Sequence, residues 1–255
     1  MIGIFLSDQG KVRNHNEDAG GIFHHEKNQV LAVVADGMGG HKAGDVASQL
    51  AVSTLHKKWN ETSYILQPGE AEKWMRNAIT EVNREILHHS RENEECRGMG
   101  TTVVAALCNN QFTTIGHIGD SRVYLANGDG FVRITEDHSL VNELVRSGQI
   151  SEEQAETHPR KNVLLKALGT DENVSPDIRT LEFEEGDRLL LCSDGLTNKV
   201  QEHELSRLSE YNGNWQDFCQ SFINLANERG GEDNITMAVV QNSDTSLKEG
   251  VDCDE

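Results

Sequence analysis

Aspartate residues lie at the ends of the most apolar segments of this sequence. In VLAVVADGMGGHKAGD, six apolar residues run directly into Asp36. The segment DRLLLCSDG repeats this arrangement at Asp194, and TTIGHIGD does so at Asp120. In GGEDNITMAVV the order is reversed, because Asp233 precedes the apolar residues. A single aspartate in such a place often only forms a turn or caps a helix, but four instances of one pattern suggest a shared site.

Carboxylates that converge at one edge of a sheet need a positive charge between them. Two anions about 5 Å apart repel by roughly 3 kcal/mol at an effective dielectric constant of about 20. The sequence contains no cysteine pair or histidine pair with metal-ligand spacing, so the available ligands are oxygens, which favour Mg²⁺ or Mn²⁺ over zinc. Two such ions activate a water and stabilise the charge that develops during in-line attack on a phosphate ester. The pattern therefore favours phosphoester hydrolysis.

Further side chains near these carboxylates could complete such a site. Glu17 and Asp18 add two acids in the segment VRNHNED. Arg13 lies in the same segment, and its planar guanidinium suits a dianionic phosphate. His41, at the start of a predicted helix, could donate a proton to the leaving alkoxide. A histidine at a helix start that has no chemical role explains His41 equally well.

The elements that must position these residues are apolar strands and amphipathic helices. Apolar residues at three-and-four spacing predict helices over 43–55, 70–92 and 214–229. Short apolar runs predict strands over 2–6, 30–35, 101–107, 112–118, 122–125, 131–134, 178–183, 188–192 and 235–240. The strands come in neighbouring groups with long helices between the groups. This order favours antiparallel sheets with helices packed outside them.

Two segments differ from this pattern. Residues 138–169 read as a small helical insertion, with a short helix around 140–145 and a possible capping box formed by Ser151 and Gln154. The tail over 242–255 is polar and acidic without periodicity, which predicts a frayed end. The rest of the chain has no internal repeat or linker, so we expect one domain over 1–241.

Composition excludes several classes of function. The net charge of −19 argues against nucleic acid as a partner. The longest apolar runs are too short to cross a bilayer, and the amino terminus lacks the pattern of a signal peptide. Five cysteines without a C-x-x-C pair fit a reduced compartment. We therefore expect a cytoplasmic protein with no membrane segment.

Seven segments resemble, in order, the motifs of bacterial metal-dependent serine/threonine protein phosphatases of the PPM, or type 2C, family. They are RNHNED, VVADGMGGH, GMGTT, GDSR, DHSLVNELVRSGQIS, CSDGL and GGEDNITM. The resemblance covers residues 1–241. It implies an α+β fold, an α-β-β-α four-layer sandwich of two stacked antiparallel sheets flanked by helices, in which residues 138–169 form a flap beside the site.

The resemblance also implies the activity and its partners. Members hydrolyse phosphoserine and phosphothreonine in proteins with a metal-activated water at a binuclear Mn²⁺ or Mg²⁺ centre, with a weaker third ion in bacterial members. The expected partners are phosphoproteins, among them a serine/threonine kinase and its substrates, and we expect a monomer. The alternative is a non-catalytic regulator of the same fold that binds phosphoproteins. The acids of the motifs and Arg13 are all present, which favours the enzyme.

The same resemblance implies a role for each matching residue. The metal ligands that it implies are Asp18, Asp36, Gly37, Asp120, Asp194 and Asp233. Among them Asp36 bridges two ions, Gly37 offers its backbone carbonyl, and Asp120 binds the third ion. Asp18, and more loosely Glu17, act through metal-bound water, and Arg13 binds the phosphate. In animal members the proposed general acid directly follows the Asp-Gly pair, whereas here Met38 has that place and His41 comes later.

Overall fold

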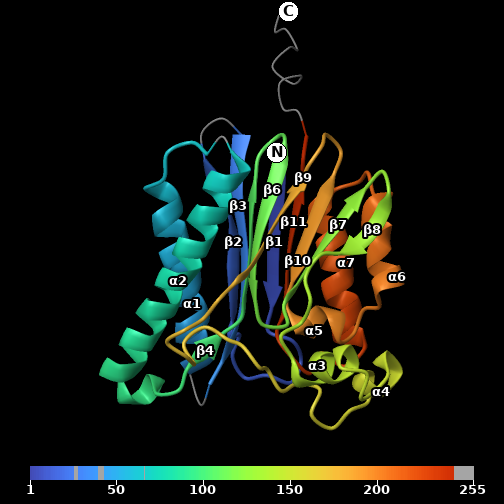
Figure 1. Ribbon diagram of the computed structural model, residues 1–255. Helices are drawn as coiled ribbons and strands as arrows, with labels where there is room; N and C mark the ends of the chain where they lie inside the picture. Colours follow the sequence, from blue (N-terminus) through green and yellow to red (C-terminus); the bar gives the residue numbers. More distant parts are fainter. Residues whose placement is uncertain (26–27, 40–42, 66, 244–255) are drawn as a thin grey trace, which may run out of the picture.

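The structure is a computed structural model that describes residues 1–25, 28–39, 43–65 and 67–243, and it contains two antiparallel sheets (Figure 1). In one sheet the strand order is β1 (Ile2–Asp8), β11 (Ile235–Gln241), β10 (Arg188–Cys192), β7 (Arg122–Asn127) and β8 (Gly130–Arg133). In the other it is β2 (Asp18–His25), β3 (Gln29–Met38), β5 (Val103–Cys108), β6 (Phe112–Ile118) and β9 (Asp177–Glu182), with β4 (Gly100–Thr101) paired to β3.

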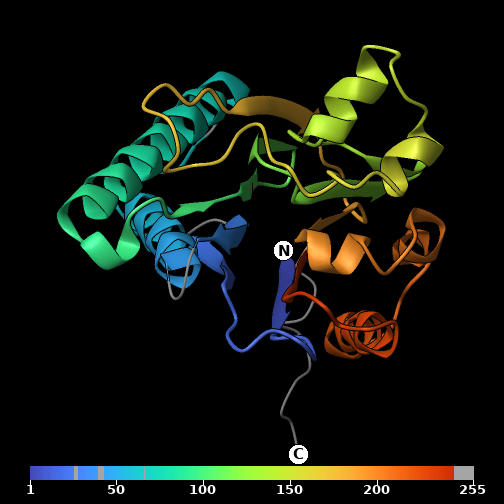
Figure 2. The ribbon, with the colours of Figure 1, turned by 90° about the horizontal axis from the view of Figure 1, so that it is seen from below.

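Helices cover the outer face of each sheet (Figure 2). The β3 sheet packs against α1 (Ala43–Asn60) and α2 (Pro68–Glu92), and η2 (Glu94–Cys96) follows α2. The β10 sheet packs against α5 (Asp194–Thr197), α6 (Glu202–Leu205), η3 (Ser206–Ser209) and α7 (Trp215–Glu228). The order of layers is therefore helix, sheet, sheet, helix, which confirms the predicted four-layer α+β sandwich.

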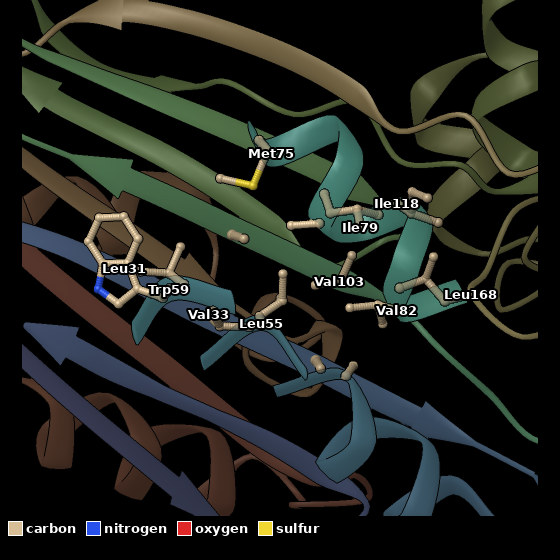
Figure 3. Packing of buried hydrophobic residues seen from close by; sticks show 14 of the residues in the cluster. Leu31, Val33, Leu55, Trp59, Met75, Ile79, Val82, Val103, Ile118 and Leu168 are labelled. Atoms are coloured by element: carbon tan, nitrogen blue, oxygen red, sulfur yellow. The ribbon is translucent and has the colours of Figure 1, made fainter. Parts of the chain in front are cut away.

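Each sheet is buried on both faces, which explains why its central strands are continuously apolar. Along β3, Leu31 and Val33 pack against α1 and α2, while Val30 and Val34 pack between the sheets. Figure 3 shows the core between the β3 sheet and its helices, where Leu55 and Trp59 of α1 and Met75 and Ile79 of α2 cover the sheet. Side chains alternate along a strand, so Asp36 shares the side of Val34, between the two sheets.

Several predicted boundaries were wrong for local reasons. The strand predicted over 30–35 continues to Met38, so Asp36 and Gly37 lie inside β3 and not after it. The strand predicted over 101–107 is interrupted at Thr102, where β4 ends and β5 begins. The strand β2 was not predicted at all, because its glycine pair, Gly20 and Gly21, lowers strand propensity.

Residues 138–169 contain two short helices, α3 (Leu140–Arg146) and α4 (Glu152–Glu156). The predicted capping box is confirmed, since Gln154 N–H donates to Ser151 Oγ and Ser151 N–H donates to Gln154 Oε1. Both helices lie at the end of the sandwich where β4 and α5 are found (Figure 1). In the part of the chain that the structure describes, every helix is too short or too polar to span a membrane.

Candidate metal centre

The pairing of β2 with β3 places two of the predicted acids side by side. Asp18, the first residue of β2, lies opposite Asp36 in the antiparallel register. Thr102 fixes the backbone of Asp36 from the other side, because Asp36 N–H donates to Thr102 Oγ1 at 3.0 Å and Thr102 N–H donates to the Asp36 carbonyl at 2.8 Å. The break between β4 and β5 therefore serves to hold the aspartate.

Gly37 allows the chain to pass between two other backbone segments. A Cβ atom at this position would lie 2.0 Å from the Gly44 carbonyl oxygen of α1 and 2.6 Å from the Glu17 carbonyl oxygen. Gly37 N–H donates to that same Glu17 carbonyl at 3.1 Å. The absence of a side chain lets α1, β3 and the segment before β2 meet at one point.

The second sheet brings Asp194 and Asp233 to this point. Asp194 is the first residue of α5 and follows β10 after Ser193, and Asp233 lies two residues before the start of β11. The two turns are in close contact, because a Cβ atom on Gly195 would lie 1.9 Å from the Asn234 carbonyl oxygen. Ser193 Oγ donates to Asp18 Oδ2 at 2.8 Å and so connects the two sheets.

These carboxylates raise one another's pKa. Burial raises the pKa of Asp18 to about 7, and the charges of Asp194 and Asp233 add to this increase. Burial raises the pKa of Asp36 well above its usual range, with Asp18 as the strongest of the neighbouring charges. The pKa of Asp194 is also raised, by burial and then by Asp233. A group of acids this difficult to ionise needs a cation to be fully charged.

Two buried oxygens indicate how well a cation would fit. Oδ1 of Asp18 and Oδ1 of Asp194 are buried and receive no hydrogen bond from any described residue. Buried polar atoms are normally hydrogen-bonded, so two unpaired carboxylate oxygens in one cluster are what a cation site requires. Hard divalent cations prefer oxygen donors. The residues present therefore fit Mg²⁺ or Mn²⁺.

Arg13 lies at the rim of this cluster. Its Nη2 donates to Asp233 Oδ2 at 2.8 Å, and its Nη1 lies 4.0 Å from Glu17 Oε2. The Arg13 side chain is 46 % exposed, whereas that of Glu17 is 15 % exposed. The guanidinium is therefore held by two acids and still accessible to a ligand in solution.

Asp120 reaches the same region from the turn between β6 and β7. Burial raises its pKa to about 7, and the charge of Asp194 contributes to this increase. Asp120 and Asp194 both line a cleft of about 760 Å³ that extends beneath the 138–169 segment, where Val141 and Val145 of α3 also line it. Its volume lies within the range of about 300–1,000 Å³ that is typical of ligand-binding clefts.

The structure brings together all the described residues that the sequence predicted, and it adds others. Ser193, Thr102 and Asn234 were not predicted. Asn234 Oδ1 accepts from Glu17 N–H at 2.8 Å, and its Nδ2 donates to the carbonyls of Gln9 and His15. These three residues lie inside the motifs CSDGL, GMGTT and GGEDNITM, so their proximity to the acids was the available signal. His41 lies outside the described residues.

Comparison with known proteins agrees with this geometry. Residues 10–239 match the family described as protein phosphatase 2C. The serine/threonine phosphatase stp of Listeria monocytogenes is 47% identical over 241 residues, which are 94% of this chain and 96% of that protein. The chain belongs to the protein phosphatase 2C family.

Solved structures are similar as well. The serine/threonine phosphatase Stp1 from Staphylococcus aureus superposes with a TM-score of 0.87 at 42% identity, over 94% of each chain. The catalytic domain of the serine/threonine protein phosphatase PstP, solved in complex with two manganese ions, has a TM-score of 0.78 at 32% identity and covers 95% of this chain and 98% of that chain.

Proposed function

We propose that this protein is a metal-dependent phosphatase that hydrolyses phosphoserine and phosphothreonine in proteins. The observation that carries the proposal is the convergence of buried carboxylates from both sheets. Two of them, Asp18 and Asp194, have an oxygen that receives no hydrogen bond from a described residue. The Listeria and Staphylococcus relatives named as serine/threonine phosphatases support the same activity.

Two Mn²⁺ or Mg²⁺ ions would be held by the acids at the sheet edges, with a third at Asp120. The residues proposed to hold them are Asp18, Asp36, Gly37, Asp120, Asp194 and Asp233. Bound divalent ions lower the pKa of water and offset the charge of the reacting phosphate. The two manganese ions in the PstP structure support the number of main sites.

The residues of the chain itself bind and orient the substrate. Arg13 presents its guanidinium at the rim, where the acids that hold it also set its direction. The Ser193 hydroxyl group donates to Oδ2 of Asp18, and Oδ1, which receives no hydrogen bond from the described part of the chain, would bind a cation. Glu17 Oε2 lies 4.0 Å from Arg13 Nη1, and His41 remains the proposed proton donor to the leaving alkoxide.

The proposal extends to the biological setting. Residues 1–241 would form the phosphatase domain, with 138–169 as a flap over the substrate cleft and 242–255 as a tail. The enzyme would act as a cytoplasmic monomer and oppose a serine/threonine kinase on shared phosphoproteins. Two relatives support the action on phosphoproteins: the Listeria monocytogenes protein is named serine/threonine phosphatase stp, and the Streptococcus pneumoniae protein is named protein phosphatase PhpP.

The activity is tested with a phosphothreonine peptide. We expect turnover in Mn²⁺, none in excess chelator, and a loss of about a hundredfold or more in Asp36→Asn and Asp194→Asn, because several kcal/mol of charge stabilisation depend on the cations. Asp217→Asn on the exposed face of α7 is the matched control and should keep full activity.

The alternative is a non-catalytic regulator that binds phosphoproteins. Phosphopeptide binding in Mn²⁺ without phosphate release from any phosphoserine or phosphothreonine peptide would establish that alternative and contradict the proposed activity. Turnover that survives complete metal removal would contradict the metal-dependent mechanism.

A further inference from the structure

Two histidine side chains hold the backbone of Gly119, the residue before Asp120. His117 Nε2 lies 3.0 Å from the Gly119 carbonyl oxygen, and Gly119 N–H donates to His138 Nδ1 at 3.1 Å. The backbone N–H of His138 also donates to the Gly119 carbonyl at 2.8 Å. Gly119 has a φ of +111°, a conformation that only glycine adopts easily. Both backbone polar groups of this residue, the N–H and the carbonyl, are held by hydrogen bonds.

These contacts determine the tautomer of each imidazole. A carbonyl only accepts, so His117 carries its proton on Nε2; an amide N–H only donates, so His138 has a lone pair on Nδ1 and its proton on Nε2. That proton is donated to Asp177 Oδ2 of β9 at 3.1 Å. The two rings stack with centroids 4.6 Å apart, and burial lowers the pKa of His117 to about 4, which keeps this ring neutral.

The pair is not optimised for stability alone. His117 is 2 % exposed, and its Nδ1 receives no hydrogen bond from any described residue. A buried nitrogen without a partner destabilises the folded state. An apolar side chain would avoid this cost but could not hold the Gly119 carbonyl.

The geometry does not favour a metal ion at this cluster. His117, His138 and Asp177 could place three ligand atoms within 4.8 Å of one another. However, the proton on His138 Nε2 blocks the lone pair that a cation needs. The Lys166 ammonium group already lies 3.4 Å from that nitrogen and 3.7 Å from Asp177 Oδ1.

The cluster also joins both ends of the flap to Asp120. His138 begins the 138–169 segment, and its carbonyl accepts from Leu165 N–H at 2.7 Å near the other end. Lys166 follows Leu165 and lies 3.7 Å from Asp177. We call His138 and Leu165, which join the two ends of the segment, the flap base. A change in its position would therefore move Gly119 and, with it, Asp120.

We propose that His117 and His138 are positioning residues, which hold the Gly119 turn so that the Asp120 carboxylate faces the metal centre and which connect the flap to that centre. The proposal rests on the proposed function, because it takes Asp120 as a ligand of the weakest ion. Asp177 has an indirect, supporting part: its hydrogen bond with His138 keeps that ring in the required orientation.

The test compares variants that keep or remove the two hydrogen bonds. His138→Asn retains an acceptor where Nδ1 lies, and His117→Gln retains a donor where Nε2 lies, whereas His138→Leu and His117→Leu retain neither. We expect both leucine variants to weaken the lowest-affinity Mn²⁺ site by about tenfold or more. The amide variants should stay within about threefold of wild type. Mn²⁺ binding is read by calorimetry and by electron paramagnetic resonance, independently of turnover.

A double-mutant cycle shows whether the effect passes through Asp120. Asp120→Asn should remove the weakest Mn²⁺ site, and adding His138→Leu should then change Mn²⁺ binding and kcat/KM little further. Additive losses, or leucine variants with wild-type Mn²⁺ binding, would overturn the proposal. So would amide variants that bind Mn²⁺ as weakly as the leucine variants do.

A surface variant covers the case in which the leucine variants do not fold. Asp177→Ala removes a side chain that is 60 % exposed, and we expect it to weaken the same Mn²⁺ site several-fold while the metal-free protein stays folded. Wild-type Mn²⁺ binding in Asp177→Ala would contradict its supporting part. Failure of the proposed function would be seen separately, as a wild-type protein that binds Mn²⁺ without turnover.

Discussion

At the scale of single residues, Asp233 has two neighbours with competing needs. As a proposed metal ligand it faces Asp194, and it also accepts a hydrogen bond from Arg13 at 2.8 Å. Its two oxygens accept from different donors, Oδ2 from Arg13 and Oδ1 from Asn234 N–H at 2.9 Å. One carboxylate can still do both, because each of its oxygens has two acceptor sites. The proposed phosphate-binding arginine is therefore oriented by a residue of the proposed cation site, and the Asp233 side chain would connect the two functions.

Arg13→Ala separates these functions. We expect the KM for a phosphothreonine peptide to rise by roughly ten- to a hundredfold, because a charge-assisted hydrogen bond to a charged group is lost. Mn²⁺ affinity should stay the same or increase slightly, since Asp233 loses a competing cation. Steady-state kinetics measure the KM, and calorimetry measures the Mn²⁺ affinity.

Arg13→Lys is the matched control and should give an intermediate KM, because it keeps the charge without the planar fork. If Arg13→Ala lost Mn²⁺ affinity as strongly as substrate affinity, the arginine would belong to the support of the cation site and would not be a phosphate ligand.

At the scale of elements, glycines decide how closely strands and helices approach the site. A Cβ atom on Gly20 of β2 would lie 2.4 Å from the Val33 carbonyl oxygen and 2.5 Å from the Phe5 ring. This close packing leaves room only for a residue without a side chain. The segment forms a strand for that reason, although its glycines make its sequence unlike that of a strand. The same requirement at Gly37 lets α1 approach β3 beside Asp36.

Gly37→Ala should disturb this contact. Its Cβ would lie 2.0 Å from the Gly44 carbonyl oxygen, so we expect the free energy of unfolding to fall by about 1–3 kcal/mol. The melting temperature should fall by roughly 2–4 °C for each kcal/mol, and Mn²⁺ affinity should fall with it. Differential scanning calorimetry with and without Mn²⁺ measures both effects.

Gly128→Ala is the control, because a Cβ there meets no atom within 4 Å and its φ is not in the left-handed region. It should leave both quantities unchanged within error. Equal melting temperatures for Gly37→Ala and the wild type would show that α1 can move away from β3 without cost.

At the scale of the whole molecule, the buried acids of the candidate metal centre destabilise the metal-free protein, and the packing of the sandwich offsets this cost. The pKa values of Asp18 and Asp120 are raised from 3.8 to about 7 in the folded protein, so between these values the folded state binds more protons than the unfolded state. Stability of the metal-free protein therefore falls as pH rises through this window. His117 and His138 act in the opposite direction, because burial lowers the pKa of His117 from 6.5 to about 4 and also lowers the pKa of His138. The acids with raised pKa outnumber these two histidines, since they include Asp18, Asp36, Asp120 and Asp194.

We accordingly expect the melting temperature in chelator to be lower at about pH 7.5 than at about pH 5.5. Mn²⁺ should reverse the trend, because cations bind the deprotonated carboxylates. Asp120→Asn should reduce the pH dependence of the melting temperature in chelator. This reduction would distinguish titration of the buried acids from the effect of the overall net charge. A metal-free melting temperature that rises steadily over this range would contradict the raised pKa values.

Much of the chemistry could be predicted from sequence because it depends on local patterns. Apolar runs that end on Asp36, Asp194 and Asp120 indicated oxygen ligands at strand ends, and helical periodicity predicted α1, α2 and α7. The strand β2 could not be predicted in this way, nor could the short helices α5 and α6, because packing outweighs their local propensities.

The sequence by itself therefore determined the kind of residues at the site, and through the order of its motifs it indicated the class of protein. Only the tertiary structure decided which acids meet: β1 pairs with β11 from the other end of the chain, and Ser193 bonds Asp18 across the two sheets. The clamp of His117 and His138 on Gly119 likewise appears only when β6, the flap base and β9 are brought together. Such contacts join residues far apart in the chain, and local periodicity carries no information about them.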